Sequence, residues 1–185
     1  MTSFSGDRMI KSSVVATMKA LGLRDFVETG TYHGDTSAFM ATLGFNAHTC
    51  EINPETLAKA LERHGHTPNW HPHLGNSSAW LAENPAESRP ALFYLDAHWE
   101  SYWPLLDELI AISDTTQRGA IVIHDFKVPG RPFGFDSYAG NDLGMDYIRP
   151  TIEARFGDVV AWHNDDAEGP MRGVAFLTFD TRPIA

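Results

Sequence analysis

Cysteine, basic residues and long apolar runs are scarce in this sequence of 185 residues. The single cysteine, Cys50, excludes an intramolecular disulfide, which fits a reducing compartment and predicts a cytoplasmic protein. No window approaches the ~20 apolar residues of a membrane span, and we expect no signal peptide because the first residues lack a continuous apolar core. The 14 Lys and Arg against 24 Asp and Glu give a formal charge of −10, which argues against nucleic acid and anionic membranes as partners.

The sequence otherwise has an ordinary globular composition, with 43% apolar and 21% charged residues. Its length suits one sizeable core and no linker or repeat divides it, so residues 1–185 are predicted to form a single domain. Residues 1–24 indicate an amphipathic lead helix, since Met9, Val14 and Met18 recur at helical spacing. We expect this helix to pack on the sheet edge or over the site. The oligomeric state is left open, a homodimer included.

The stretch from Phe26 to Glu51 has the order strand, turn, helix, strand. A short apolar run ends on the acid Glu28, a turn with two glycines and a helix beginning near Asp35 follow, and a second apolar run leads to Glu51. This order is the plan of a mononucleotide-binding half of a doubly wound sheet.

The residue types in this turn indicate what it would bind. Gly30 and Gly34 allow backbone to approach a ligand closely because neither has a Cβ. An acid at the end of the second strand, Glu51, suits the two hydroxyls of a ribose. The acid Glu28 before the first glycine disfavours a diphosphate and suits a positively charged ligand end. A tight strand-to-helix turn without any ligand is the alternative.

The rest of the chain continues to alternate between helical and strand-like patterns, which predicts an α/β fold: a doubly wound, mostly parallel seven-stranded sheet with helices on both faces. The further strands are expected at residues 69–74, 91–95, 119–123, 158–162 and 173–179. The further helices are expected at residues 55–63, 79–82, 102–112 and 143–156, the third with an inward stripe of Trp103, Leu106, Leu109 and Ile110.

Two neighbouring predicted strands deliver acids and histidines to one rim of the sheet. Asp96 and His98 follow the apolar run 91–95, and His124 and Asp125 follow the run 119–123. Ligands of open α/β sheets bind outside the carboxyl ends of the strands, so this rim is the expected site. Residues 127–142, rich in glycine, proline and aromatics, follow directly and are predicted to form a substrate-facing loop.

The stretch FVETGTYHGDTSAF, with Glu51 beyond it, resembles motif I of the class I methyltransferases, which bind S-adenosylmethionine. The resemblance implies that the turn holds the amino-acid part of that cofactor, that Glu51 holds its ribose, and that the Gly75–Ser78 turn reads its adenine. Asn76 or Ser77 could equally cap a helix. The implied cofactor-binding residues are Glu28, Gly30, Thr31, Gly34, Glu51, Asn76, Ser77 and Asp96.

The segments LDAHWESYWPLLDEL and GAIVIHDFKVPG resemble the catechol-type and macrolide-sugar-type O-methyltransferases. By that resemblance Asp96 and Asp125 match two acids that bind a divalent cation such as Mg²⁺. Two positions depart from the pattern, because Phe126 replaces the third ligand, an Asn, and the family's catalytic lysine is missing, with His98 or Glu100 nearby instead.

Methylation of an oxygen on a small-molecule acceptor is therefore the predicted function, with S-adenosylmethionine as cofactor and a divalent metal as an open question. Removal of the acceptor's proton is assigned to His98 first and His124 second, because a histidine pKa lies near working pH and Asp125 can orient such a base. A nicotinamide-dependent oxidoreductase and a non-catalytic module on the same fold are the alternatives. His66, His71 and His73 suggest a solvated edge rather than a metal site.

Overall fold

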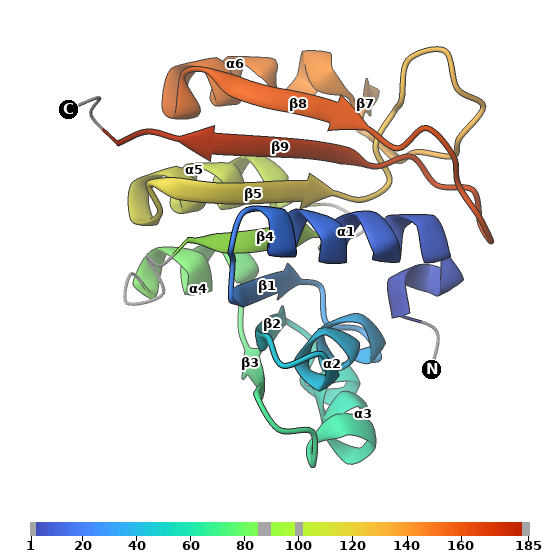
Figure 1. Cartoon of the computed structure of the whole chain (residues 1–185), viewed down its shortest axis with the longest axis vertical. Coiled ribbons are helices and arrows are strands. Elements are labelled where there is room, and N and C mark those ends of the chain that lie inside the picture. The colour runs from blue at the N-terminus through green and yellow to red at the C-terminus, as the bar shows by residue number, and fades with distance from the viewer. Residues whose placement is uncertain (1–2, 85–89, 99–101, 183–185) are drawn as a thin grey trace.

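The computed structural model describes residues 3–84, 90–98 and 102–182, and within them a seven-stranded sheet forms the centre of the molecule (Figure 1). The strand order is β3-β2-β1-β4-β5-β9-β8, and all neighbouring pairs are parallel except β5–β9 and β8–β9. This confirms the predicted doubly wound, mostly parallel sheet. The strands are β1 Asp25–Thr29, β2 Asn46–Glu51, β3 Trp70–Leu74, β4 Ala91–Leu95, β5 Arg118–Ile123, β8 Val159–His163 and β9 Ala175–Asp180.

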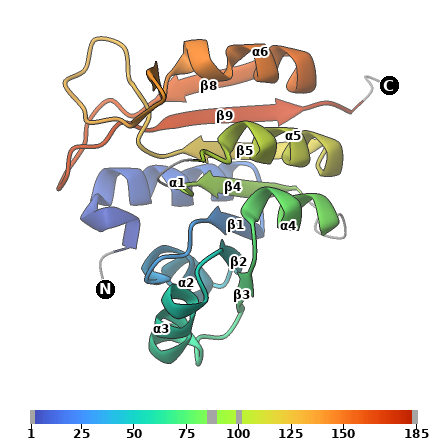
Figure 2. The same cartoon turned by 180° about the vertical axis from the view of Figure 1, so that it is seen from behind.

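Helices cover both faces of this sheet, with α1 to α3 on one face and α4 to α6 on the other (Figures 1 and 2). The central strands are buried on both sides because successive side chains point to opposite faces. In β4, Leu92 and Tyr94 pack toward α1 and α2, whereas Phe93 and Leu95 pack toward α5 and α6. The helices are α1 Arg8–Ala20, α2 Asp35–Thr42, α3 Pro54–His64, α4 Ser77–Glu83, α5 Leu105–Thr115 and α6 Met145–Phe156, and none of those in the described part of the chain is both long and apolar enough to cross a membrane.

The lead helix α1 lies across the middle of the sheet rather than at its edge, which corrects the expected placement (Figure 1). It buries Ile10, Val14 and Met18 against the central strands, and Met9 is 45% exposed although it was expected in the buried stripe. Asp7 begins the helix by accepting hydrogen bonds from the backbone N–H groups of residues 9 and 10, the ordinary role of an N-cap acid.

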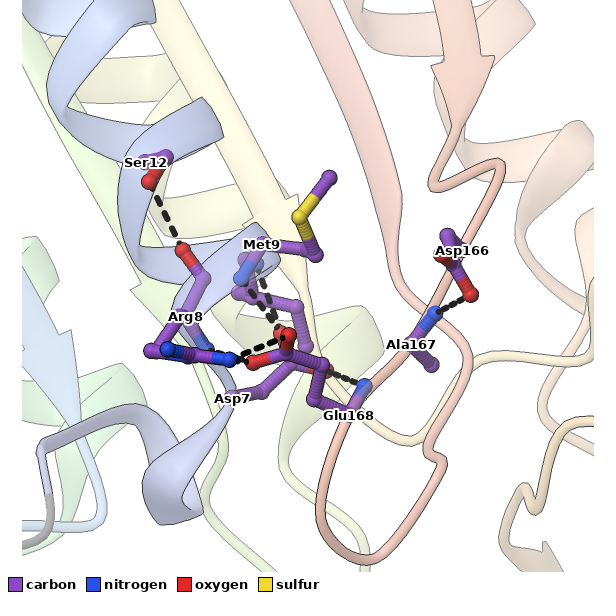
Figure 3. Close-up of polar contacts among 8 residues, drawn as sticks. Asp7, Arg8, Met9, Ser12, Asp166, Ala167 and Glu168 are labelled. Atoms are coloured by element: carbon purple, nitrogen blue, oxygen red, sulfur yellow. Dashed lines mark hydrogen bonds and ion pairs between the residues drawn. The ribbon is translucent and has the colours of Figure 1, made fainter.

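The start of the chain is also tied to the connection between β8 and β9 (Figure 3). The second carboxylate oxygen of Asp7 accepts the backbone N–H of Glu168 at 2.8 Å, and the Arg8 guanidinium donates to both oxygens of the Glu168 carboxylate at 2.9 and 3.0 Å. These contacts join residues that are 160 and 161 positions apart in the chain, and no sequence pattern indicates such contacts.

Helix α5 begins three residues later than predicted and buries a different stripe. Trp103 precedes the helix, and Leu106 and Ile110 are only partly buried. The side chains that point inward are Leu105, Glu108, Leu109, Ala111 and Ile112. The prediction differs from the structure because it placed the aromatic Trp103 in the buried stripe and left out the acid Glu108.

The predicted loop 127–142 folds back over the end of β5 and contains a two-stranded ribbon, β6 Ser137–Tyr138 with β7 Asn141–Asp142. The backbone N–H of Asp136 donates to the carbonyl of Asp125 at 2.9 Å, which holds the loop against the rim. Val128 and Phe133 pack with Ala167 in a small separate cluster. The loop therefore lies beside the expected site.

Candidate active site

A cavity of about 540 Å³ opens at the carboxyl ends of β1, β2 and β4. Open α/β sheets bind ligands at this edge. The lining residues come from the turns after these strands and after β3: Gly30, Tyr32, Cys50, Glu51, Ile52, Asn53, Thr56, Gly75, Asn76, Ser77, Asp96, Ala97, His98, Tyr102 and Pro104. Six residues singled out in the sequence meet here, namely Gly30, Glu51, Asn76, Ser77, Asp96 and His98.

The Glu51 carboxylate has its orientation fixed by backbone donors. One oxygen accepts the N–H of Tyr32 at 2.9 Å, and the other accepts the N–H of Asn53 at 3.0 Å. Hydrogen bonds to a charged oxygen are the stronger kind, so the carboxylate stays in one orientation at the cavity wall. Each oxygen keeps lone pairs for a ligand hydroxyl. Tyr32, which sequence reasoning missed, has a φ of 48°, a backbone conformation that is uncommon for residues other than glycine.

The turn between β1 and α2 is held tightly against β2 and β4. The backbone N–H groups of Gly30 and Thr31 both donate to the carbonyl of Cys50. Gly30 has a φ of +80°, and a Cβ there would lie 2.9 Å from the backbone oxygen of Asp96. Only glycine fits that place, because both the conformation and the space exclude a side chain. Gly34, at the start of α2, faces Trp70 and His64 rather than the cavity.

Two polar residues of this turn lie beneath it and do not line the cavity. Glu28 is 3% exposed and accepts a hydrogen bond from the Thr49 hydroxyl at 2.8 Å. Burial raises the pKa of Glu28 to about 8, although hydrogen bonds from Ser37 and Thr49 oppose the shift. The Thr31 hydroxyl is likewise buried, 2.7 Å from that of Thr49. The structure thus places Glu28 and Thr31 as supports of the turn rather than as groups facing a ligand.

The turn after β3 is both a cap and a cavity wall. Asn76 is the N-cap of α4, and its side-chain oxygen accepts the N–H of Ala79 at 3.1 Å and the hydroxyl of Ser78 at 2.7 Å. Capping occupies the side-chain oxygen and leaves the amide N–H₂ group for a ligand. The expected capping role is therefore present, and because Asn76 lines the cavity it does not exclude a binding role.

Ser77 connects this wall to a buried acid that sequence reasoning missed. Its hydroxyl donates to Glu108 on α5 at 2.5 Å, and the Glu108 side chain is 1% exposed. Burial raises the pKa of Glu108 to about 7, with the Ser77 hydrogen bond acting in the opposite direction. The signal was an acid within the apolar pattern of α5, two residues beyond Leu106.

His124 lies between two carboxylates at the end of β5. Its Nδ1 is 3.0 Å from Asp96 Oδ1 and 3.1 Å from Asp125 Oδ1, and the ring is 6% exposed. Burial lowers the pKa of His124, but the two carboxylates outweigh it and raise the pKa to about 10. Its Nε2 is buried without a hydrogen-bond partner. His124 is thus a buried cation whose Nδ1 is held by two carboxylates, which disfavours it as a base.

Asp125 is also paired with an arginine that enters from the connection between β8 and β9. Arg172 donates from Nε to Asp125 and from Nη2 to Asp136 of the 127–142 loop. Despite the effect of burial, His124 and Arg172 hold the pKa of the Asp125 carboxyl well below its usual range. Asp125 has a φ of 58°, an uncommon backbone conformation for a residue other than glycine.

The carboxylates of this rim do not fit the divalent-metal site that the sequence resemblance implied. Asp96, His124 and Asp125 have ligand-type atoms within 4.8 Å of one another, as have His98, Asp125 and Asp136. Asp125 already bonds a guanidinium and an imidazole, and Phe126 is fully buried, stacked on His163. Mg²⁺ requires several oxygen ligands in near-octahedral geometry, which this arrangement does not offer.

His98 is exposed at the boundary between the large cavity and a smaller one that Asp125 and Asp136 line. Aromatic side chains form the adjacent wall: the Trp103 ring stacks on Tyr147 with centroids 4.8 Å apart and lies 4.9 Å from Tyr138. The other base considered from sequence, Glu100, lies outside the described residues. Among the described residues, the histidines at 66, 71 and 73 belong to neither metal-type group.

The family model described as a methyltransferase domain matches residues 27–126, more than half of the chain. No curated protein matches the chain in sequence. The matched span runs from β1 to the residue after Asp125, so it includes the Glu51 cavity and stops before Asp136 and Arg172.

Solved structures share the fold at low sequence identity. An O-methyltransferase from Bacillus cereus in complex with SAH is 16% identical with a TM-score of 0.68, and the match covers 94% of this chain and 81% of that one. The O-methyltransferase TomG from Streptomyces achromogenes, in complex with SAM, is 16% identical with a TM-score of 0.57 over 91% and 88% of the two chains. An rRNA methylase from Streptococcus thermophilus is 17% identical with a TM-score of 0.52 over 84% and 87%. One fold thus serves quite different acceptors.

Proposed function

Because this chain belongs to the family of methyltransferase domains, we propose that it transfers the methyl group of S-adenosylmethionine to an oxygen of a small molecule. The proposal rests on the cavity at the strand ends and on the chemistry of its walls. Two of the similar structures contain SAM or SAH, and both are O-methyltransferases, which supports the choice of cofactor and of acceptor atom.

The observation that carries the proposal is the Glu51 carboxylate, fixed by two backbone N–H groups at the cavity wall. Two adjacent ribose hydroxyls can each donate to one of its oxygens, and a carboxylate that is already oriented loses little entropy on binding. Ile52 and Asn76 are the lining residues that would hold the adenine, and the amide N–H₂ group of Asn76 could donate a hydrogen bond to it.

The charged end of the cofactor belongs at the Gly30 turn. Gly30 and Asp96 line the cavity from neighbouring strand ends, so this part of the wall would hold the methionine part. The sulfonium and the ammonium group are positive, and Asp96, 30% exposed at the cavity wall, is the acid that faces them. Glu28 supports the turn from below, which gives this acid a structural role in place of the expected contact.

Methyl transfer itself is an in-line displacement. The acceptor oxygen attacks the methyl carbon, an O–C bond forms as the S–C bond breaks, and the electron pair remains on sulfur to give adenosylhomocysteine. The enzyme's main contribution is to hold the two reactants in line. The acceptor's proton passes to His98, whose imidazole lies at the boundary between the cofactor cavity and the aromatic wall. No step is assigned to a metal.

The acceptor is best described as a small molecule with a flat or apolar face. Trp103, Tyr138 and Tyr147 offer ring surfaces beside His98. A nucleic acid is disfavoured because the chain has a formal charge of −10 and the rim carries Asp96, Asp125 and Asp136. The nicotinamide alternative finds no support at the Gly30 turn, which has an acid before its first glycine and no third glycine.

Calorimetry with adenosylhomocysteine tests the proposal. We expect binding to the wild-type chain and a loss of about 1–3 kcal/mol in Glu51→Ala, the usual cost of removing a charged hydrogen-bond partner. Glu62→Ala, which removes an exposed carboxylate from the same half of the molecule, should bind as the wild type does. Unchanged affinity in Glu51→Ala, or binding of NAD in preference to adenosylhomocysteine, would refute the assignment.

A further inference from the structure

We propose that the guanidinium of Arg172 takes the place of a divalent cation between the Asp125 and Asp136 carboxylates, so that methyl transfer by this chain needs no metal. The inference rests on the proposed function for the reaction and on the rim's own contacts for the cation. It concerns the very carboxylate, Asp125, that the resemblance assigned to a metal.

The geometry at Arg172 is that of a bridge. Nε donates to Asp125 Oδ1 and Nη2 donates to Asp136 Oδ1, so one planar group joins two carboxylates that come from different loops. A guanidinium is suited to this role because its donors form a rigid fork and it stays charged at every working pH. The side chain is 27% exposed, so the pair is partly shielded from water.

The charges leave little reason for a further cation to bind. The Arg172 guanidinium already contacts two of the three carboxylates of this rim, Asp125 and Asp136, so Asp125 is paired with a permanent cation. A divalent ion at Asp125 would lie next to this guanidinium, and like charges placed together repel each other. The position after Asp125 offers no oxygen, because Phe126 is buried in the core.

The segment that carries Arg172 is held firmly before and after it. The Asn164 amide donates to the carbonyls of residues 166 and 172 and accepts the N–H of Val174. Gly173 lies against the segment that follows β5, so closely that a Cβ on Gly173 would be 2.1 Å from the Phe126 carbonyl oxygen. Gly134 leaves space for the Arg172 side chain, since a Cβ on Gly134 would lie 3.1 Å from Arg172 Nη1.

The far end of the same segment is anchored to the start of the chain, as Figure 3 shows. Glu168 accepts from the Arg8 guanidinium, and its N–H donates to the Asp7 carboxylate at 2.8 Å. A mobile surface arginine would not need these anchors. Their presence indicates that the guanidinium is positioned in advance, as a built-in cation must be to replace a bound ion.

Binding of Mn²⁺, followed by electron paramagnetic resonance and by thermal shift, tests the inference without using enzyme activity. We expect no stoichiometric site in the wild type and a new site in Arg172→Gln, with affinity about tenfold or more above the wild type, since a like charge has been removed. Arg131→Gln is the matched control, because it breaks an exposed ion pair with Asp165 on the same face and should gain no site.

The outcomes separate cleanly. Mn²⁺ binding by the wild type that disappears in Asp125→Asn would overturn the inference, and so would an Arg172→Gln protein that gains no site. Arg172→Met, of similar length and without charge, serves the same purpose where the glutamine variant does not fold. Adenosylhomocysteine calorimetry on the wild type is read separately: failure of that binding refutes the proposed function and leaves the metal result to stand on its own.

Discussion

The two sides of the site are built by different means. On the cofactor side, Glu51 is oriented by backbone N–H groups, the more distant of them only 19 residues away in sequence. On the acceptor side, Asp125 and Asp136 are joined by Arg172, which is 47 and 36 residues from them. The proposed cofactor side thus depends largely on the local unit from β1 to β2, whereas the proposed acceptor side depends on loops that the whole sheet brings together.

The largest expected effect is the change with pH in the free energy of unfolding, which the buried carboxyl of Glu28 beneath the turn after β1 causes. The folded pKa of Glu28 is about 8, above the ordinary value of 4.5, so its contribution is fully present below about 4.5 and is lost as pH rises through 8. We expect the wild type to lose several kcal/mol over this range, at about 1 kcal/mol or more per pH unit. Denaturant unfolding as a function of pH measures it.

Glu28→Gln should remove the share of that slope that Glu28 contributes between about pH 4.5 and 8, because a neutral amide replaces the buried acid. Glu108→Gln should remove a separate and smaller share between about pH 4.5 and 7, where Glu108 titrates. His124, with a folded pKa of about 10, adds a further loss from about 6.5 to 10, which neither variant changes. An unchanged slope in Glu28→Gln would show that this carboxyl is not buried in the acid form.

The next effect concerns the acceptor side. His98→Ala should lower turnover by about a hundredfold or more, the usual scale for loss of a general base. Adenosylhomocysteine affinity should change little, since that affinity belongs to the other side of the cavity. His66→Ala, an exposed histidine away from the site, is the control. A His98→Ala enzyme with normal turnover but weak cofactor binding would move His98 into the cofactor pocket.

The smallest effect isolates the backbone of the cofactor side. Gly30→Ala and Gly130→Ala both place a side chain at positive φ, at a cost of about 1–2 kcal/mol. At Gly130 nothing lies within 4 Å of the new Cβ, whereas at Gly30 it meets the Asp96 carbonyl oxygen at 2.9 Å. Both variants should lose stability, and only Gly30→Ala should also lose adenosylhomocysteine affinity. Equal affinity in the two proteins would mean that the close approach at Gly30 is irrelevant to binding.

The fold was predictable because it depends on patterns within single elements. The apolar run 91–95 and the acids after each strand are visible in the chain, and they place Glu51, Asp96, His124 and Asp125 at one rim. Motif resemblance added the family. The burial of Glu28 was not predictable, because a turn sequence does not tell which side of the backbone an acid takes.

Ionic partners were also beyond the sequence. The pairing of Arg172 with Asp125 could not be predicted, since nothing in the local pattern of either residue links the two. Glu108 was hidden for a different reason: an acid on a helix is normally solvated, and its hydrogen bond with Ser77 on α4 has no signature in the sequence. Long-range pairs such as Arg8 with Glu168 have no local sequence signature at all.

The reversal of β9 has a practical consequence for engineering. Because β9 runs against β5, the hairpin between β8 and β9 turns at the same edge where the parallel strands end. Both ends of residues 164–174 are therefore anchored by neighbouring strands, and exposed positions such as Pro170 and Met171 can be varied while Asn164, Glu168 and Arg172 keep their contacts. A library confined to this hairpin and selected on new acceptors would vary the chemistry of the site and leave the Glu51 cavity unaltered.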